Sequence, residues 1–184
     1  MNITDKFSRK LRDVRISVTD RCNFRCAYCM PKEIYNSEYQ FFKKNEILSF
    51  EEIIRLSKIF SSLGTKKIRL TGGEPLLRKN IHILVKYLKE IENISDISMT
   101  TNGVLLSEKK ASLLKESGLD RLTVSLDTLN PENFSEISGS KYSPENVLEG
   151  INNAINAGFE NIKINMVVKK NVNHKDIIPL LEKF

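Results

Sequence analysis

The sequence predicts an α/β protein, a partial (β/α) barrel of about five parallel strands within one domain that covers residues 1–184. Short β-branched runs alternate with helical patterns, and the connections between them are mostly short, which favours parallel strands covered by helices. A complete eight-unit barrel normally takes about 250 residues. The chain has 184 residues, so we expect the barrel to be incomplete at its carboxyl-terminal side.

The expected strands are five segments rich in Val, Ile and Thr. They cover residues 14–19, 67–72, 97–102, 121–126 and 162–168. Because helices separate them, the carboxyl ends of all five should meet at one edge of the sheet, where α/β proteins build their active sites.

Helices are expected where a capping residue opens a periodic segment and a glycine closes it. Ser49 and Glu52 form a capping box, and Gly64 should end that helix. The other expected helices cover residues 80–92, 107–118 and 143–158, with a last one that starts late because of Pro179. In residues 30–48 the apolar residues show no clear helical or strand-like spacing, and long connections of this kind are often functional.

Composition excludes several classes of protein. Apolar residues make up 40% and charged residues 28%, which is ordinary for a globular domain. The net charge of +6 comes from scattered basic pairs, which indicates solvated faces and no nucleic-acid partner. We see no apolar run of the roughly 20 residues that a membrane helix needs and no secretory signal, so we expect a cytoplasmic protein without a membrane partner.

All three cysteines, Cys22, Cys26 and Cys29, lie within eight residues just after the first expected strand. A disulfide framework is a poor explanation, because the number is odd and the spacing is crowded. A structural zinc ion would need a fourth ligand, and the two histidines lie far along the chain. An iron-sulfur cluster fits closely spaced thiolates better, and three ligands would leave one iron of a four-iron cluster open.

The Cys-x-x-x-Cys-x-x-Cys spacing, with Tyr28 before the last cysteine, resembles the signature of the radical S-adenosylmethionine (SAM) enzymes. Longer motifs resemble the branch of that superfamily that cyclises GTP at the start of molybdenum cofactor biosynthesis. These motifs lie at residues 15–26, 28–31, 69–76, 100–103, 124–127 and 163–165. They follow the order of that family across nearly the whole chain.

The resemblance implies a radical SAM core that holds one 4Fe-4S cluster on Cys22, Cys26 and Cys29, with SAM chelated at the open iron. Cleavage of SAM would give a 5′-deoxyadenosyl radical that takes the 3′ hydrogen of GTP. The sugar radical would then attack C8 of the guanine and form a cyclised GTP. The activity is that of a lyase.

The resemblance also assigns SAM contacts to Tyr28, Gly73 and Ser125. Glycine has no Cβ, so the Gly72-Gly73 pair would let backbone groups approach a ligand closely. Read without the resemblance, the glycine pair is a plain turn, the serine caps a strand end, and the tyrosine packs over the cysteines.

For GTP, the resemblance assigns Arg15, Arg69, Thr100 and Lys163. Arginine and lysine suit phosphate oxygens, and all four positions lie on or just after expected strands. Arg15 and Lys163 interrupt apolar strands, which suggests buried cations that need an anion. The other interpretation is that both point outward with the alternation of the strand.

The family implies further partners: an electron donor protein or reductant, and downstream the cyclic pyranopterin monophosphate synthase of the pathway. Members of the family carry a C-terminal second-cluster domain that this sequence does not include. We expect further protein, or a second copy in a homodimer, to cover the edge left by the fifth strand. Two alternatives stay open: a radical SAM enzyme that acts on a peptide or another small molecule, and a non-catalytic metal-cluster interaction module.

Overall fold

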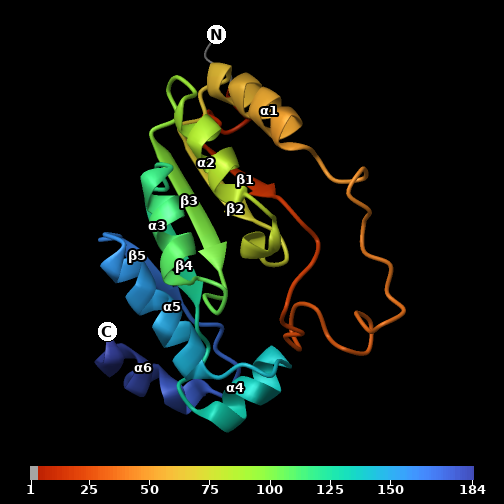
Figure 1. The fold of residues 1–184 in the computed structure, drawn as a ribbon, viewed down its shortest axis with the longest axis vertical. Coiled ribbons are helices and arrows are strands. Elements are labelled where there is room, and N and C mark those ends of the chain that lie inside the picture. The colour runs from red at the N-terminus through yellow and green to blue at the C-terminus, as the bar shows by residue number, and fades with distance from the viewer. Residues whose placement is uncertain (1–3) are drawn as a thin grey trace.

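The computed structural model describes residues 4–184, so residues 1–3 of the expected domain lie outside it. Five strands form one parallel sheet in the order β1-β2-β3-β4-β5 (Figure 1). They are β1 (Asp13–Ser17), β2 (Lys67–Thr71), β3 (Asp96–Thr101), β4 (Arg121–Ser125) and β5 (Ile162–Asn165). The expected fold class and all five expected strands are therefore confirmed.

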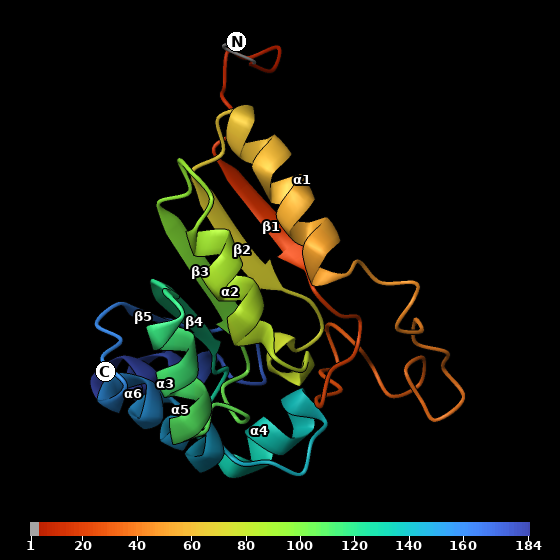
Figure 2. The ribbon, with the colours of Figure 1, turned by 45° about the horizontal axis from the view of Figure 1, so that its top comes forward.

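Helices cover one face of this sheet. Figure 1 and Figure 2 show α1, α2, α3 and α5 side by side over the strands, with α4 beyond their carboxyl ends. The helices are α1 (Phe50–Ser62), α2 (Ile81–Lys89), α3 (Glu108–Glu116), α4 (Pro131–Ser138), α5 (Pro144–Asn156) and α6 (Ile177–Lys183). Two short 3-10 turns, Pro75–Leu77 and His174–Asp176, complete the described elements.

The first helix shows how the local sequence fixes the ends of an element. Glu52 N donates to Ser49 Oγ at 3.2 Å, and Ser49 N donates to Glu52 Oε2 at 2.7 Å, which completes the expected capping box. After the helix, Gly64 adopts φ +106°, a value that favours glycine. The sequence placed both ends correctly.

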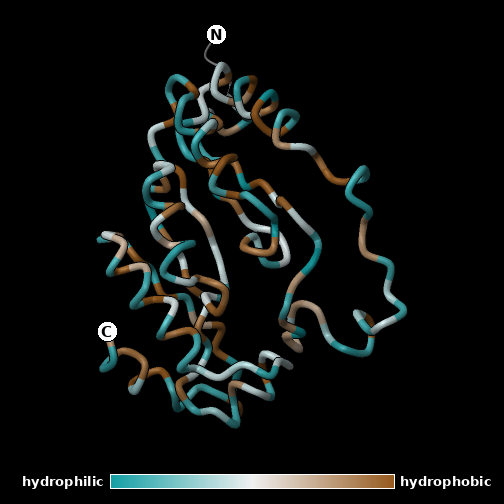
Figure 3. The backbone as a smooth tube through the Cα atoms, in the orientation of Figure 1, coloured by the Kyte–Doolittle hydropathy of each residue, from teal (hydrophilic) through white to brown (hydrophobic). Residues whose placement is uncertain are grey.

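The strand faces that meet the helices form the core. Ile68, Leu70, Ile97, Met99 and Leu122 expose 1% or less of their surface. Figure 3 shows the matching alternation of hydrophobic and hydrophilic residues along the helices. Burial of this apolar layer against the sheet is the main source of stability for such an architecture.

The opposite face of the sheet is polar, and within residues 4–184 no helix layer covers it (Figure 2). In register, Arg15 pairs with Arg69, Arg69 with Ser98, and Ser98 with Arg121. Paired residues of neighbouring strands point to the same face, so one row of this face carries three arginines. In a second row Thr123 of β4 lies between Thr100 and Lys163. This face would be the interior of a closed barrel.

Two details differ from the expectation. Helix α4 was not expected from the sequence, although Pro131 follows Asn130, whose side chain caps it by accepting from Asn133 N. Helix α6 begins at Ile177, two residues before Pro179. Proline is tolerated there because backbone N–H groups of the first turn have no partner within the helix. No helix in residues 4–184 is long and apolar enough to span a membrane.

Candidate active site at the carboxyl ends of the strands

The cysteines lie in a loop that leaves the carboxyl end of β1, named here the cysteine loop (residues 18–30). Val18 N still donates to Thr71 O at 2.9 Å, so the loop starts beside β2. Further on, Cys29 N and Met30 N both donate to Cys26 O, at 3.0 and 2.9 Å, and form a tight turn. All three cysteines are free thiols; Cys29 is exposed and the other two are partly buried.

Helix α4 anchors this loop from the far side. Arg25 N donates to Ser138 O at 2.8 Å, and Ala27 N donates to Ile137 O at 3.1 Å. Phe24 packs edge-on against Phe134 with their ring centroids 5.8 Å apart. The loop is therefore fixed by backbone contacts on either side of Cys26 and by one aromatic contact.

The cysteine loop and the strand ends enclose a cavity of about 230 Å³. Among its lining residues are all three cysteines, the three expected SAM contacts and one expected GTP contact: Cys22, Cys26, Cys29, Tyr28, Gly73, Ser125 and Thr100. These residues come from the cysteine loop, the turn after β2, and strands β3 and β4. The fold therefore brings together positions up to about a hundred residues apart.

Three expected GTP residues lie outside this cavity, on the polar face of the sheet. Arg69 is half-buried, whereas Arg15 and Lys163 are exposed. The expectation of buried cations is therefore wrong for Arg15 and Lys163, because the sheet is open in this chain and solvent reaches both strands at its edges. Within residues 4–184 none of the three forms an ion pair.

The glycine pair after β2 allows two backbone segments to touch. A Cβ on Gly72 would lie 2.4 Å from Thr19 O, and one on Gly73 would lie 2.2 Å from Arg21 O. Gly73 N donates to Thr19 O at 2.7 Å, and Glu74 N donates to Arg21 O at 2.8 Å. Side chains at these positions would push the cysteine loop away from β2, so both glycines have a packing reason to be there.

The buried carboxylate of Glu74 accepts three hydrogen bonds beside the glycine pair. Glu74 is 1% exposed, and its Oε1 accepts from Leu76 N at 3.0 Å and from Thr101 Oγ1 at 2.7 Å. Its Oε2 accepts from Asn102 N at 2.8 Å. Asn102 Nδ2 then donates to Asn23 Oδ1 at 2.8 Å. Burial raises the pKa of Glu74, although the three hydrogen bonds oppose that shift.

A second carboxylate closes the other side of the cavity. Asp127, which is 8% exposed, accepts from Tyr28 Oη at 2.6 Å and from Val167 N at 2.8 Å. The tyrosine hydroxyl thereby ties the cysteine loop to the ends of β4 and β5. Burial, followed by the hydrogen bond to Asp127, raises the pKa of Tyr28, so the hydroxyl stays a donor.

The three cysteines lie on one loop and line one cavity, which fits a 4Fe-4S cluster because each cysteine of such a cluster ligates a different iron. Burial raises the pKa of Cys22, and it raises the pKa of Cys26 to about 12. The raised pKa values favour the neutral thiols, and a bound metal reverses this preference because the thiolate is the form that ligates it. In the described part of the chain no three His, Cys, Asp or Glu side chains gather around one metal ion. Neither His82 nor His174 lines the cysteine cavity.

Sequence reasoning missed four residues that organise the site: Arg25, Glu74, Asn102 and Asp127. Each lies inside a motif that was recognised, directly beside a residue to which a role was given or within two positions of one. The signal that could have identified them is a charged or amide side chain at the carboxyl end of a strand or between the cysteines. Several of their partners are distant in sequence, such as Thr101 for Glu74 and Tyr28 for Asp127, so those contacts required the fold.

The fold and the sequence both have relatives among known proteins. The family model of the Radical SAM superfamily matches residues 16–184. The GTP 3′,8-cyclase of Staphylococcus epidermidis is 52% identical over 182 residues, which is 99% of this chain and 53% of that protein. The GTP 3′,8-cyclase of Staphylococcus haemolyticus is 48% identical with the same coverage. The chain thus spans about half the length of the curated relatives it matches.

Solved structures share the fold at low sequence identity. SuiB of Streptococcus suis bound to S-adenosylmethionine matches with a TM-score of 0.74 and 20% identity, covering 92% of this chain and 37% of that one. Methylornithine synthase matches with a TM-score of 0.72 and 18% identity, covering 94% and 50%. Together with the family match, the cysteine spacing and the five-stranded parallel sheet show that the chain belongs to the radical SAM superfamily.

Proposed function

We propose that this chain is the SAM-cleaving part of a GTP 3′,8-cyclase, a cytoplasmic radical SAM lyase that catalyses the first step of molybdenum cofactor biosynthesis. Its product would be (8S)-3′,8-cyclo-7,8-dihydroguanosine 5′-triphosphate. The observation that carries the proposal is the single cavity where the three cysteines meet Tyr28, Gly73 and Ser125. The curated relatives, about half of whose length the chain spans, support the choice of GTP as substrate.

The cysteine loop would hold one 4Fe-4S cluster through Cys22, Cys26 and Cys29. When bound, the cluster supplies the electron that cleaves the sulfonium of SAM. The chain's own residues then have positioning tasks. Tyr28, Gly73 and Ser125 would hold SAM in the cavity, and the loop anchored on α4 would limit access of water to it.

GTP would lie along the polar face of the sheet. Thr100 borders the cavity, while Arg69 and Arg15 share a row about two residues nearer the amino end, a separation of roughly 6–7 Å along a strand. Lys163 lies on β5, two strands away from Thr100 and in the same row as Thr100. Arg15, Arg69 and Lys163 have no carboxylate partner in the part of the chain that the structure describes, and three such cations suit a triphosphate, which supplies the missing negative charge.

The proposal includes partners that the reaction needs. An electron donor protein or other reductant would deliver the electron, and a cyclic pyranopterin monophosphate synthase would take up the product. The edge of β5 would be covered by further protein or by a second copy of the chain.

The decisive experiment reconstitutes the chain anaerobically with iron and sulfide and adds SAM, dithionite and GTP. Chromatography then measures 5′-deoxyadenosine and cyclised GTP. We expect 5′-deoxyadenosine from the wild type and none from Cys26→Ala. A chain that carries the cluster but releases no 5′-deoxyadenosine contradicts the assignment as a SAM-cleaving unit.

The GTP assignment has its own test. Arg69→Ala should weaken GTP binding by about 10-fold to 100-fold, because a hydrogen bond to a charged group contributes about 1.5–3 kcal/mol. SAM binding should stay unchanged. Arg55→Ala, at an exposed position on α1, is the matched control. Equal loss of SAM and GTP affinity in Arg69→Ala would contradict the assignment of Arg69 to the GTP site alone.

A further inference from the structure

Arg25 lies between two of the cysteines, and no step described so far uses its side chain. Its guanidinium makes three hydrogen bonds to backbone carbonyls. Nη1 donates to Cys22 O at 2.9 Å and to Phe24 O at 2.8 Å, and Nε donates to Tyr35 O at 2.8 Å. One planar side chain therefore holds two carbonyls of the cysteine loop and one carbonyl of the segment that follows it.

That segment, residues 31–49, is the long connection between the cysteine loop and α1, and it runs outside the sheet (Figure 1). Three of its aromatic rings pack on one another. Tyr39 lies 4.5 Å from Tyr35 and 4.8 Å from Phe41 between ring centroids. The guanidinium of Arg25 lies over the Phe41 ring, 5.6 Å from its centroid. Arg25 thus also contacts the aromatic cluster through a cation–π interaction.

The backbone of the same residue is fixed from a third direction. Arg25 N donates to Ser138 O, and a Cβ added to Gly139 would lie 2.5 Å from Arg25 O. The end of α4, the aromatic segment and the cysteine loop therefore meet at one residue. A residue held by three segments has little freedom, so its charge occupies a fixed place beside the cysteines.

We propose that Arg25 is a positioning residue that holds the cysteine loop in the shape needed to take up the cluster and whose fixed positive charge raises the cluster's reduction potential. The proposal rests on the cluster of the proposed function. A nearby cation favours the more negative, reduced state of a cluster, and charge and hydrogen bonding around the sulfurs are the protein's means of setting that potential. A half-buried cation is screened less by salt than an exposed one.

Arg21 offers a matched control on the same loop. Its guanidinium lies over the same Phe41 ring, 5.3 Å from the centroid, but it donates to Phe42 O at 3.4 Å. Arg21→Met and Arg25→Met therefore remove the same charge beside the same ring. They differ in the contacts with carbonyls of the cysteine loop.

The test measures iron affinity, as iron and sulfide bound per chain at limiting reagent, and the rate at which they load. It then measures the midpoint potential of the loaded cluster by redox titration followed by electron paramagnetic resonance. Arg25→Met should bind iron at least about 10-fold more weakly, the size of effect found when groups that orient metal ligands are removed, and it should load correspondingly more slowly. Its potential should shift to a more negative value. The midpoint potential of Arg25→Lys should stay close to that of the wild type, because lysine restores the positive charge. This variant should still load slowly, because lysine lacks the planar fork of arginine.

Two outcomes overturn the proposal. One is that both Arg25 variants load and titrate like the wild type. The other is that Arg21→Met changes loading and potential as much as Arg25→Met does. If Arg25→Met proves unstable by circular dichroism, Arg25→Lys still decides through its loading rate. A wild-type chain that binds no cluster would instead refute the proposed function, so the two failures are distinguishable.

Discussion

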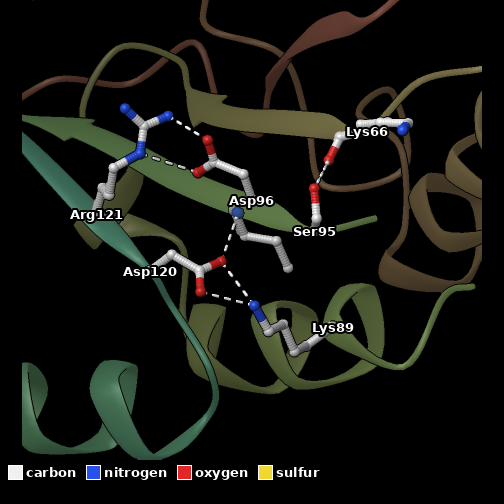
Figure 4. A network of polar contacts seen from close by, with 7 residues as sticks. Lys66, Lys89, Ser95, Asp96, Asp120 and Arg121 are labelled. Carbon is white, nitrogen blue, oxygen red and sulfur yellow. Dashed lines mark hydrogen bonds and ion pairs between the residues drawn. The ribbon is translucent and has the colours of Figure 1, made fainter. Parts of the chain in front are cut away.

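The two ends of the sheet use polar side chains in opposite ways. At the amino ends, Arg121 pairs with Asp96 at 2.5 Å, and Lys89 donates to both oxygens of Asp120 at 2.7 and 2.8 Å (Figure 4). Asp120 also accepts from Ile97 N at 2.7 Å. These charges are paired with each other and partly exposed, with 18% to 38% of each side chain accessible.

At the carboxyl ends, the carboxylates of Glu74 and Asp127 are buried, and they accept from backbone N–H groups and hydroxyls. Both carboxylates line a cavity. On the neighbouring polar face, Arg121 pairs with Asp96, whereas Arg15, Arg69 and Lys163 have no carboxylate partner within residues 4–184. The difference is that the charges at the amino ends pair with each other, whereas the buried carboxylates at the carboxyl ends line a cavity. Four predictions test this difference, from the largest expected effect to the smallest.

Cys26→Ala should abolish cluster binding, because a cubane held by two cysteines loses a third of its protein ligands. Iron analysis after anaerobic reconstitution should fall to background, while circular dichroism of the apo chain stays unchanged. Retention of the full iron content in this variant would refute the assignment of Cys26 as a ligand.

Glu74→Gln should lower the free energy of unfolding of the apo chain by about 1–3 kcal/mol, measured by urea denaturation. Hydrogen-bond donors face both carboxylate oxygens of Glu74. The NH2 group of the glutamine would therefore face a donor in place of an acceptor, and one hydrogen bond would be lost. Glu160→Gln, at an exposed position between α5 and β5, is the matched control and should leave the midpoint unchanged. Equal midpoints in both variants would show that the Glu74 network contributes nothing.

Tyr28→Phe should cost about 1.5 kcal/mol, the lower end of the range for one hydrogen bond to a charged group. The ring stays, so cluster loading should persist, but hydrogen exchange in residues 26–30 should become faster because the contact with Asp127 is lost. In a double-mutant cycle with Asp127→Ala the two changes should not be additive. Strict additivity would mean that the hydroxyl and the carboxylate do not act as a pair.

Lys89→Met should cost less than about 1 kcal/mol, since partly exposed ion pairs contribute little. Iron loading and SAM affinity should equal those of the wild type. A loss of either would show that the amino ends take part in the site, and the contrast between the two ends would fail.

The local sequence predicted the strands and the helix caps because each depends on neighbouring residues: Ser49 and Glu52 form their capping box within one turn. The cysteine spacing is equally local, and the three cysteines do line one cavity. Helix α4 was missed although Asn130 and Pro131 give it a local start signal, since it is only eight residues long. Its contacts with the cysteine loop, more than a hundred residues earlier, have no local signal. The contact of Tyr28 with Asp127 spans 99 residues, and no local pattern indicates it.

The exposure of Arg15 and Lys163 could not be predicted either. Alternation along a strand tells which residues share a face, but it does not tell whether that face is covered. Arg15 lies on β1 and Lys163 on β5, the two edges of the sheet. Both therefore remain accessible in this chain, although each lies on the face that a closed barrel would bury.

The central claim is that the carboxyl ends and the cysteine loop form one site for a cluster and SAM. Electron paramagnetic resonance of the reconstituted, dithionite-reduced chain, recorded with and without SAM, tests it most directly. The account predicts a four-iron signal that changes when SAM is added, because a cluster with three cysteine ligands has one iron free to bind it. A four-iron signal that is identical with and without SAM would contradict the claim.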